Sequence, residues 1–192
     1  MKRKAFVRKE ICRIISTDFP NLVRDKQMVV PPGMPCYRYQ NDAIDMKKRY
    51  FLVINFGNCY ASSFTFESIW TSDMQSDMLP PSDCHLEAGL SSPAGCLRIK
   101  FLDPEMPRDP IYPYEYIFPG SHDYWWDFGE GEADESFKPQ LELILNDAIG
   151  KLRKLVLPFF EVLALYHCGL KEMSPSLMAI EDKVRVNGGW PF

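Results

Sequence analysis

The sequence predicts an α+β domain, in which an N-terminal helix and C-terminal helices pack on one face of an antiparallel sheet of four to six strands. Two observations carry this prediction. Apolar residues recur with a helical period near both ends of the chain, and aromatic and β-branched runs separated by turn residues fill its middle. Neither an internal repeat nor a linker interrupts this order, so residues 1–192 are interpreted as a single domain.

The first element is an amphipathic helix. Apolar residues recur at i, i+4, i+7 and i+8 from Val7 to Ile15, which predicts a helix over residues 4–16 with its basic residues mostly on the other side. Residues 19–37 contain four prolines and a glycine. This stretch is therefore expected to be a mostly irregular connector that leads into a short strand at residues 36–40.

The middle of the chain predicts strands. Residues 50–56 and 60–70 are rich in β-branched and aromatic side chains, and Gly57-Asn58 between them favours a tight antiparallel turn, so these runs predict a hairpin. Residues 72–95 are polar and contain prolines, which is typical of a long surface loop. Three further strands are expected between proline-rich breaks, at residues 96–102, 114–118 and 122–128.

The clearest helix follows the strands. Apolar residues keep a 3.6-residue period over residues 141–156, Ser136 is placed to cap this helix, and Pro139 fits its first turn. Pro158 lacks a backbone donor and crowds the preceding turn, so we expect the helix to break or kink at Leu157.

Two more helical stretches are predicted beyond this proline. The first resumes at Phe159 and runs to His167, and Gly169 is expected to end it. Ser174-Pro175 can cap a last short helix over residues 176–183. These helices complete the layer that is expected to cover the sheet.

Composition limits the class of protein. An apolar content of 46% in 192 residues is enough to bury a core without disulfide or metal staples. No apolar run approaches the roughly 18 to 20 residues of a membrane-spanning helix. Charged residues follow the basic start where an export signal needs an apolar stretch, so we expect a cytoplasmic protein. The six cysteines show no CxxC spacing and are interpreted as free thiols.

The charge is negative overall and unevenly placed. A net charge of −4 and a pI near 5.4 argue against a general nucleic-acid binder. Residues 2–13 are basic, whereas residues 123–135 hold six carboxylates and no Lys or Arg. No glycine-rich phosphate loop and no metal-ligand spacing occurs in the sequence, so neither a cofactor nor a metal is predicted.

The most unusual stretch is residues 122–135, where an aromatic run leads directly into these carboxylates. Strand alternation places Tyr124 and Trp126 on one face and Trp125, between two acids, on the other. Such a tryptophan is a suitable anchor for a basic protein, because aromatic anchors supply interface energy while charges steer the encounter. The predicted partner-binding residues are Asp123, Trp125, Asp127, Glu130, Glu132, Asp134 and Glu135.

Other interpretations of these residues stay open. Both tryptophans could belong to the core, with the acids solvating a loop and favouring the start of the next helix. The three histidines, His85, His122 and His167, fit no catalytic motif, so no catalytic residue is predicted. A small hydrolase or transferase that pairs one of them with nearby acids is the first alternative function, and a subunit that self-associates through exposed aromatics is the second.

Four segments carry a resemblance to a family: Arg38-Tyr39, residues 50–70, Asp123-Tyr-Trp-Trp-Asp127 and Leu157-Pro-Phe-Phe160. In these segments the chain resembles a family of small bacterial α+β domains of unknown function, similar to the immunity proteins encoded beside polymorphic toxins. The resemblance implies a non-catalytic protein without an active site. We therefore predict an immunity protein whose partner is a cognate toxin or another basic protein, with no nucleic-acid or membrane partner.

Overall fold

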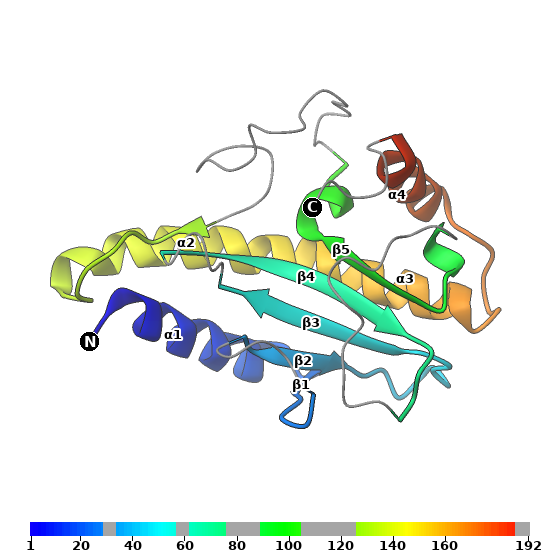
Figure 1. Cartoon of the computed structure of the whole chain (residues 1–192), viewed down its shortest axis with the longest axis horizontal. Helices are drawn as coiled ribbons and strands as arrows, with labels where there is room; N and C mark the ends of the chain where they lie inside the picture. The colour runs from blue at the N-terminus through cyan, green and yellow to red at the C-terminus, as the bar shows by residue number, and fades with distance from the viewer. Residues whose placement is uncertain (29–33, 57–61, 76–88, 105–125, 187–192) are drawn as a thin grey trace.

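The computed structural model of the chain describes residues 1–28, 34–56, 62–75, 89–104 and 126–186 (Figure 1). Over these residues, helices cover one face of an antiparallel sheet, which confirms the predicted α+β class. Within this part of the chain, no helix combines the length and apolar character needed to cross a lipid bilayer. Three predicted features lie outside the described residues: the Gly57-Asn58 turn, most of the loop at 72–95 and the strand at 114–118.

The described residues form a sheet of six strands in the order β1-β2-β3-β4-β5, with β6 paired to β4. Every neighbouring pair is antiparallel. Pairing of β3 with β4 confirms the predicted hairpin strands and sets Tyr50 opposite Trp70. The strands are β1 (Leu22–Arg24), β2 (Cys36–Tyr39), β3 (Arg49–Asn55), β4 (Ser63–Thr71), β5 (Ala94–Arg98) and β6 (Trp126–Asp127).

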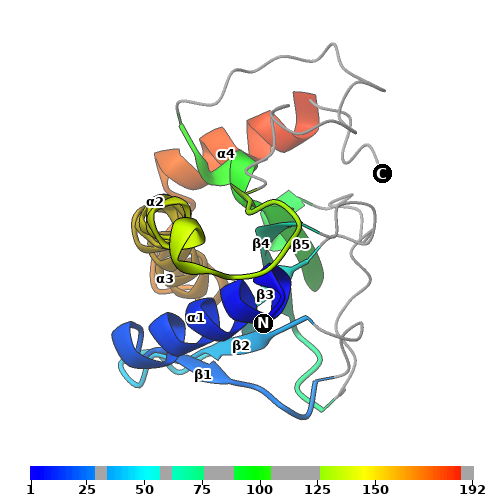
Figure 2. The same cartoon turned by 90° about the vertical axis from the view of Figure 1, so that its left-hand side faces the viewer.

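The helices confirm the predicted order around the sheet. They are α1 (Arg3–Asp18), α2 (Lys138–Lys151), α3 (Leu157–His167) and α4 (Pro175–Val186), with short 3-10 turns η1 (Gly89–Ser91), η2 (Ile99–Leu102) and η4 (Glu135–Phe137). Figure 2 shows α1 and the rod made of α2 and α3 on the same face of the sheet. Ser174 caps α4 as predicted, because its Oγ accepts a hydrogen bond from the N–H of Leu177 at 3.3 Å.

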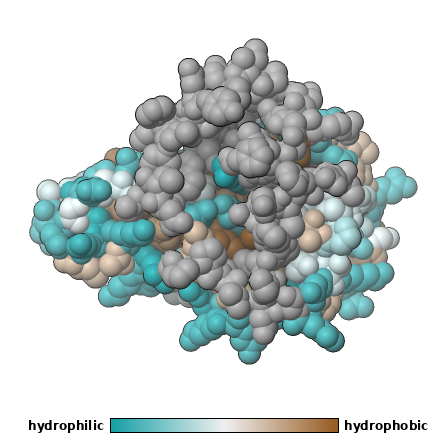
Figure 3. All heavy atoms as spheres, in the orientation of Figure 1, coloured by the Kyte–Doolittle hydropathy of each residue, from teal (hydrophilic) through white to brown (hydrophobic). Residues whose placement is uncertain are grey.

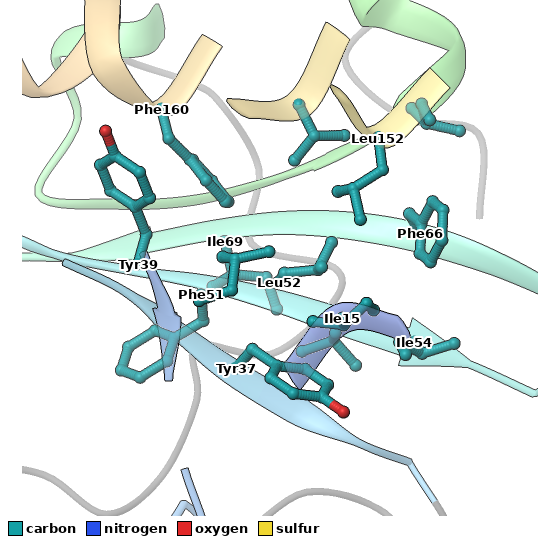
Figure 4. Packing of buried hydrophobic residues seen from close by; sticks show 14 of the residues in the cluster. Ile15, Tyr37, Tyr39, Phe51, Leu52, Ile54, Phe66, Ile69, Leu152 and Phe160 are labelled. Carbon is teal, nitrogen blue, oxygen red and sulfur yellow. The ribbon is translucent and has the colours of Figure 1, made fainter. Parts of the chain in front are cut away.

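The core lies between this face and the helices (Figure 4). Phe160 of α3 packs on Tyr39 and Tyr50, with ring centroids 5.4 and 6.1 Å apart. Trp70 is fully buried, and Gly95 lies opposite it on β5, where any Cβ would overlap the indole ring. This close approach explains why a glycine occupies the strand position.

The sequence predicted a break or a kink at Leu157, and the structure shows no break, because the rod is continuous through Pro158 (Figure 1). A π-turn, Leu152–Val156, joins α2 to α3 just before the proline. A π-turn contains one residue more than an α-turn, so the backbone can rearrange around the proline ring without ending the helix. The rod then ends where predicted, because Gly169 adopts a φ of +71° and its N–H binds the carbonyl of Tyr166.

The connector at 19–37, predicted to be mostly irregular, contains one short strand that was not predicted, β1, which forms because it pairs with β2. Two other predictions are wrong. Residues 99–102, predicted to continue a strand, form the 3-10 turn η2 instead. Asp134, and not Ser136, caps the start of the helical region, because a 3-10 turn at η4 precedes α2.

Candidate partner-binding site

The acidic segment, residues 127–135, is attached to the core by the residue that precedes it. Trp126 is buried and pairs with Phe64 of β4, and its ring stacks on that phenylalanine with centroids 5.2 Å apart. Its Nε1 donates a hydrogen bond to Asp147 of α2 at 2.7 Å. Asp127 is exposed, so the predicted alternation is confirmed at these two positions.

Two carboxylates of the segment hold its own turns. Asp127 accepts a hydrogen bond from the N–H of Gly129 at 2.8 Å, and this glycine has a φ of +65°, which favours a residue without a side chain. Asp134 accepts hydrogen bonds from the N–H groups of Ser136 and Phe137 at 3.0 and 3.2 Å. These bonds, led by the one from the Ser136 hydroxyl, lower the pKa of Asp134.

The first turn of α1 supports the segment from behind. Arg3 donates from Nε to the carbonyl of Glu132 at 3.2 Å and from Nη1 to the carbonyl of Phe128 at 3.3 Å. Its guanidinium also lies over the Phe137 ring, 4.5 Å from the centroid. The segment and the start of α1 together enclose a hollow of about 500 Å³.

The carboxylates remain on the surface although some have partners. Glu132 contacts the N-terminal amine at 2.7 Å, and Glu135 contacts Lys138 at 2.8 Å, with side chains 66% and 88% exposed. These ion pairs are exposed and screened by salt. The N-terminal amine, Lys138 and the basic residues Lys2, Arg3 and Lys4 that line the hollow offset part of the negative field of the segment. Glu130 is exposed and takes part in no ion pair with the residues that the structure describes. Figure 3 shows a mostly hydrophilic surface at this end of the molecule.

The structure brings together five of the seven predicted contact residues: Asp127, Glu130, Glu132, Asp134 and Glu135 lie on one surface loop. Asp123 and Trp125 lie outside the described residues, so the predicted tryptophan anchor stays a prediction. Trp126 belongs to the core. This agrees, for Trp126, with the alternative interpretation in which both tryptophans are buried. The site that the structure describes is therefore an ordered acidic loop.

His167, the histidine within the described residues, is held by hydrogen bonds inside the fold. His167 Nδ1 lies 2.8 Å from the Tyr50 hydroxyl and Nε2 lies 2.7 Å from the carbonyl of Leu90, so the neutral ring accepts from the tyrosine and donates to the carbonyl. Burial lowers the pKa of this imidazole to about 4. Both ring nitrogens are thus engaged in contacts within the fold. His85 and His122 lie outside the described residues.

Metal ligation finds no support in the described part of the chain, where no group of three or more His, Cys, Asp or Glu side chains converges. A second charged feature was not predicted from the sequence: a hollow of about 400 Å³ whose lining includes Arg38, Lys48 and Arg49. The basic run Lys47-Lys48-Arg49 was the signal that could have indicated it. No family model, curated protein or solved structure matches the chain.

Proposed function

We propose that the protein is a non-catalytic binding protein that docks a basic protein partner through the acidic segment. The observation that supports this most directly is the fixed shape of that segment. Its turns are held by Asp127, Asp134 and Arg3, while its carboxylates face solvent. A surface that is ordered before binding loses little conformational entropy when the partner arrives.

The charge distribution supports the same proposal. Carboxylates on one loop raise the local concentration of a positively charged protein and speed its association, and this effect weakens as salt is added. The finer proposal is an immunity protein that inhibits a cognate bacterial toxin. It is supported by the family resemblance and by the fit between an acidic loop and the basic cleft of an enzyme that acts on nucleic acid.

The alternative of a hydrolase or transferase has less support. His167, the histidine within the described residues, uses both ring nitrogens in contacts with Tyr50 and Leu90. Self-association through exposed aromatics stays a prediction, and light scattering at high protein concentration tests it. A protein that remains monomeric under those conditions contradicts self-association.

The test of the acidic segment uses two charge-reversal variants with the same change in net charge. The first replaces exposed acids of the segment that hold none of its turns: Glu130→Lys, Glu132→Lys and Glu135→Lys. The control replaces exposed acids of α2, α3 and the connection before α4: Glu142→Lys, Glu161→Lys and Glu172→Lys. Each variant is compared with the wild-type protein for capture of a partner from cells of the source organism and for the association rate with that partner.

We expect the association rate at low salt to fall about tenfold or more in the first variant, because steering by complementary charge contributes at least that much. The control variant should associate at a rate close to that of the wild-type protein. Equal rates for the two variants contradict the proposal, since the effect then reflects net charge and not this surface. Circular dichroism of both variants checks that the fold is retained.

A further inference from the structure

The basic hollow lies at the opposite end of β4 from the acidic segment. β6 pairs at Ser63 and Phe64, whereas Met74, beyond the last residue of β4, borders the hollow. The two features share no lining residue, so an inference about the hollow is independent of the proposed function. The lining of the hollow includes three cations and one carboxylate: Arg38, Lys48 and Arg49, and Asp42. The other lining residues are the polar Tyr39, Gln40 and Asn41 and the apolar Ile44, Met46 and Met74.

Arg38 has hydrogen-bond donors that the described residues do not use. Its Nε is buried without an acceptor, and the nearest carboxylate oxygen, on Asp25, lies 4.0 Å away. The other oxygen of that carboxylate accepts from the N–H groups of Gln27 and Met28 at 3.0 and 3.1 Å. A buried guanidinium nitrogen without an acceptor is unfavourable, so a ligand that supplies an oxygen would be stabilised here.

Arg49 is fixed beside Arg38 by the sheet. Arg38 lies opposite Phe51 on β3, and Arg49 is two residues from that phenylalanine on the same face. The Arg49 guanidinium lies 5.4 Å from the centroid of the Phe51 ring, and its Nε donates to the carbonyl of Asp73 at 2.8 Å. The second guanidinium is thus held in position before any ligand binds.

Lys48 adds a third cation. Its ammonium donates to the carbonyls of Ser92 and Ser91 at 2.6 and 3.3 Å, and these oxygens are neutral. Partial burial lowers the pKa of Lys48, which indicates that its charge has lost part of its hydration. Within the described residues no carboxylate lies within ion-pair distance of this ammonium. Lys48 therefore adds positive charge near the hollow, while its ammonium is held by these two carbonyls.

The geometry points to a site for a small phosphate-bearing molecule, whose phosphate is bound by Arg38 with Arg49 and whose organic part lies on the apolar wall. A phosphate has oxygens in several directions, and guanidinium groups bind them with charge-assisted hydrogen bonds. The volume of about 400 Å³ lies in the range of sites for small molecules. Ile44, Met46 and Met74 give the hollow the apolar surface that a bare inorganic anion does not need.

The experiment measures binding by titration calorimetry with inorganic phosphate, adenosine 5′-monophosphate and adenosine. Citrate and vesicles that contain phosphatidic acid are titrated in the same way as competing classes of ligand. The test variant is Arg38→Gln, which removes the unused donors, and the matched control is Arg13→Gln, an exposed arginine of α1. We expect the monophosphate to bind more tightly than phosphate, and adenosine to bind more weakly than either. Arg38→Gln should weaken binding of the monophosphate about 10- to 100-fold, the loss expected for hydrogen bonds to a charged group. Arg13→Gln should bind it as the wild-type protein does.

Three outcomes would overturn the inference. Equal affinity of the two variants for the monophosphate places binding elsewhere on the surface. Binding of citrate without binding of either phosphate probe assigns the hollow to a carboxylate. Binding to vesicles that contain phosphatidic acid, without binding of the free monophosphate, assigns it to a membrane surface. Equal unfolding midpoints of the two variants in urea confirm that a loss of binding does not come from a loss of fold.

Discussion

Replacing Arg3 by methionine tests whether α1 holds the acidic segment in place. The change removes two hydrogen bonds to the carbonyls of Phe128 and Glu132 and the contact with the Phe137 ring. Each hydrogen bond contributes about 0.5–1.5 kcal/mol and the cation–π contact about 0.5–1 kcal/mol, so the free energy of unfolding should fall by about 2 kcal/mol. Methionine keeps the length and apolar stem of the side chain.

Urea denaturation measures this loss, with Arg8→Met on the same helix as the control because the structure gives that arginine no polar contact among the described residues. With an m-value of about 2 kcal/mol per molar, the midpoint for Arg3→Met should move down by about 1 M. Amide hydrogen exchange should also become faster within residues 128–137. If the two variants unfold at the same midpoint and exchange is unchanged, Arg3 does not order the segment.

Three other changes give checks on the core and the histidine. Gly95→Ala should lower the free energy of unfolding by about 3 kcal/mol, because its Cβ overlaps the buried Trp70 ring; a smaller loss than in Ala94→Gly would contradict that packing. Trp126→Phe should lower it by about 1–2 kcal/mol through loss of the hydrogen bond to Asp147, and an unchanged urea midpoint would show that this bond contributes nothing. The folded pKa of His167 lies near 4, below its ordinary value of 6.5, so unfolding binds protons between these values: stability is full above pH 6.5 and decreases as the pH falls towards 4. His167→Gln should make the loss of unfolding free energy between pH 6.5 and pH 4 smaller by about 1–2 kcal/mol, a value that allows for the partial exposure of the ring. Identical pH profiles of the two proteins would refute this.

Sequence patterns predicted the elements whose side chains repeat with a clear period. Strand alternation separated Trp126 from Asp127, and turn chemistry placed the end of the rod at Gly169. β1 was missed because three residues are too few to show a period, and this strand exists through its pairing with β2. The cap was misplaced because Ser136 and Asp134 are both good caps, and only the extra 3-10 turn decides between them.

The acidic segment could be predicted from the sequence, whereas the basic hollow could not. The acids of the segment are near neighbours in the chain, so their clustering was visible before the structure. The cations of the hollow come from two strands, and Arg38 meets Arg49 only through the register that sets Arg38 opposite Phe51. Period and composition do not specify such a register, and for this reason the hollow was missed.

The π-turn also determines where the rod can change length. Leu152, Val156, Phe160 and Ala164 are all buried and recur every four residues. An α-helix turns by about 100° per residue. Over the twelve residues from Leu152 to Ala164, a regular α-helix would therefore rotate the buried face by about 120° beyond three full turns. The extra residue of the π-turn takes up about 100° of this drift. An inserted or deleted residue elsewhere in the rod would swing every later side chain away from the sheet, whereas at Leu152–Val156 the helix already contains a one-residue surplus.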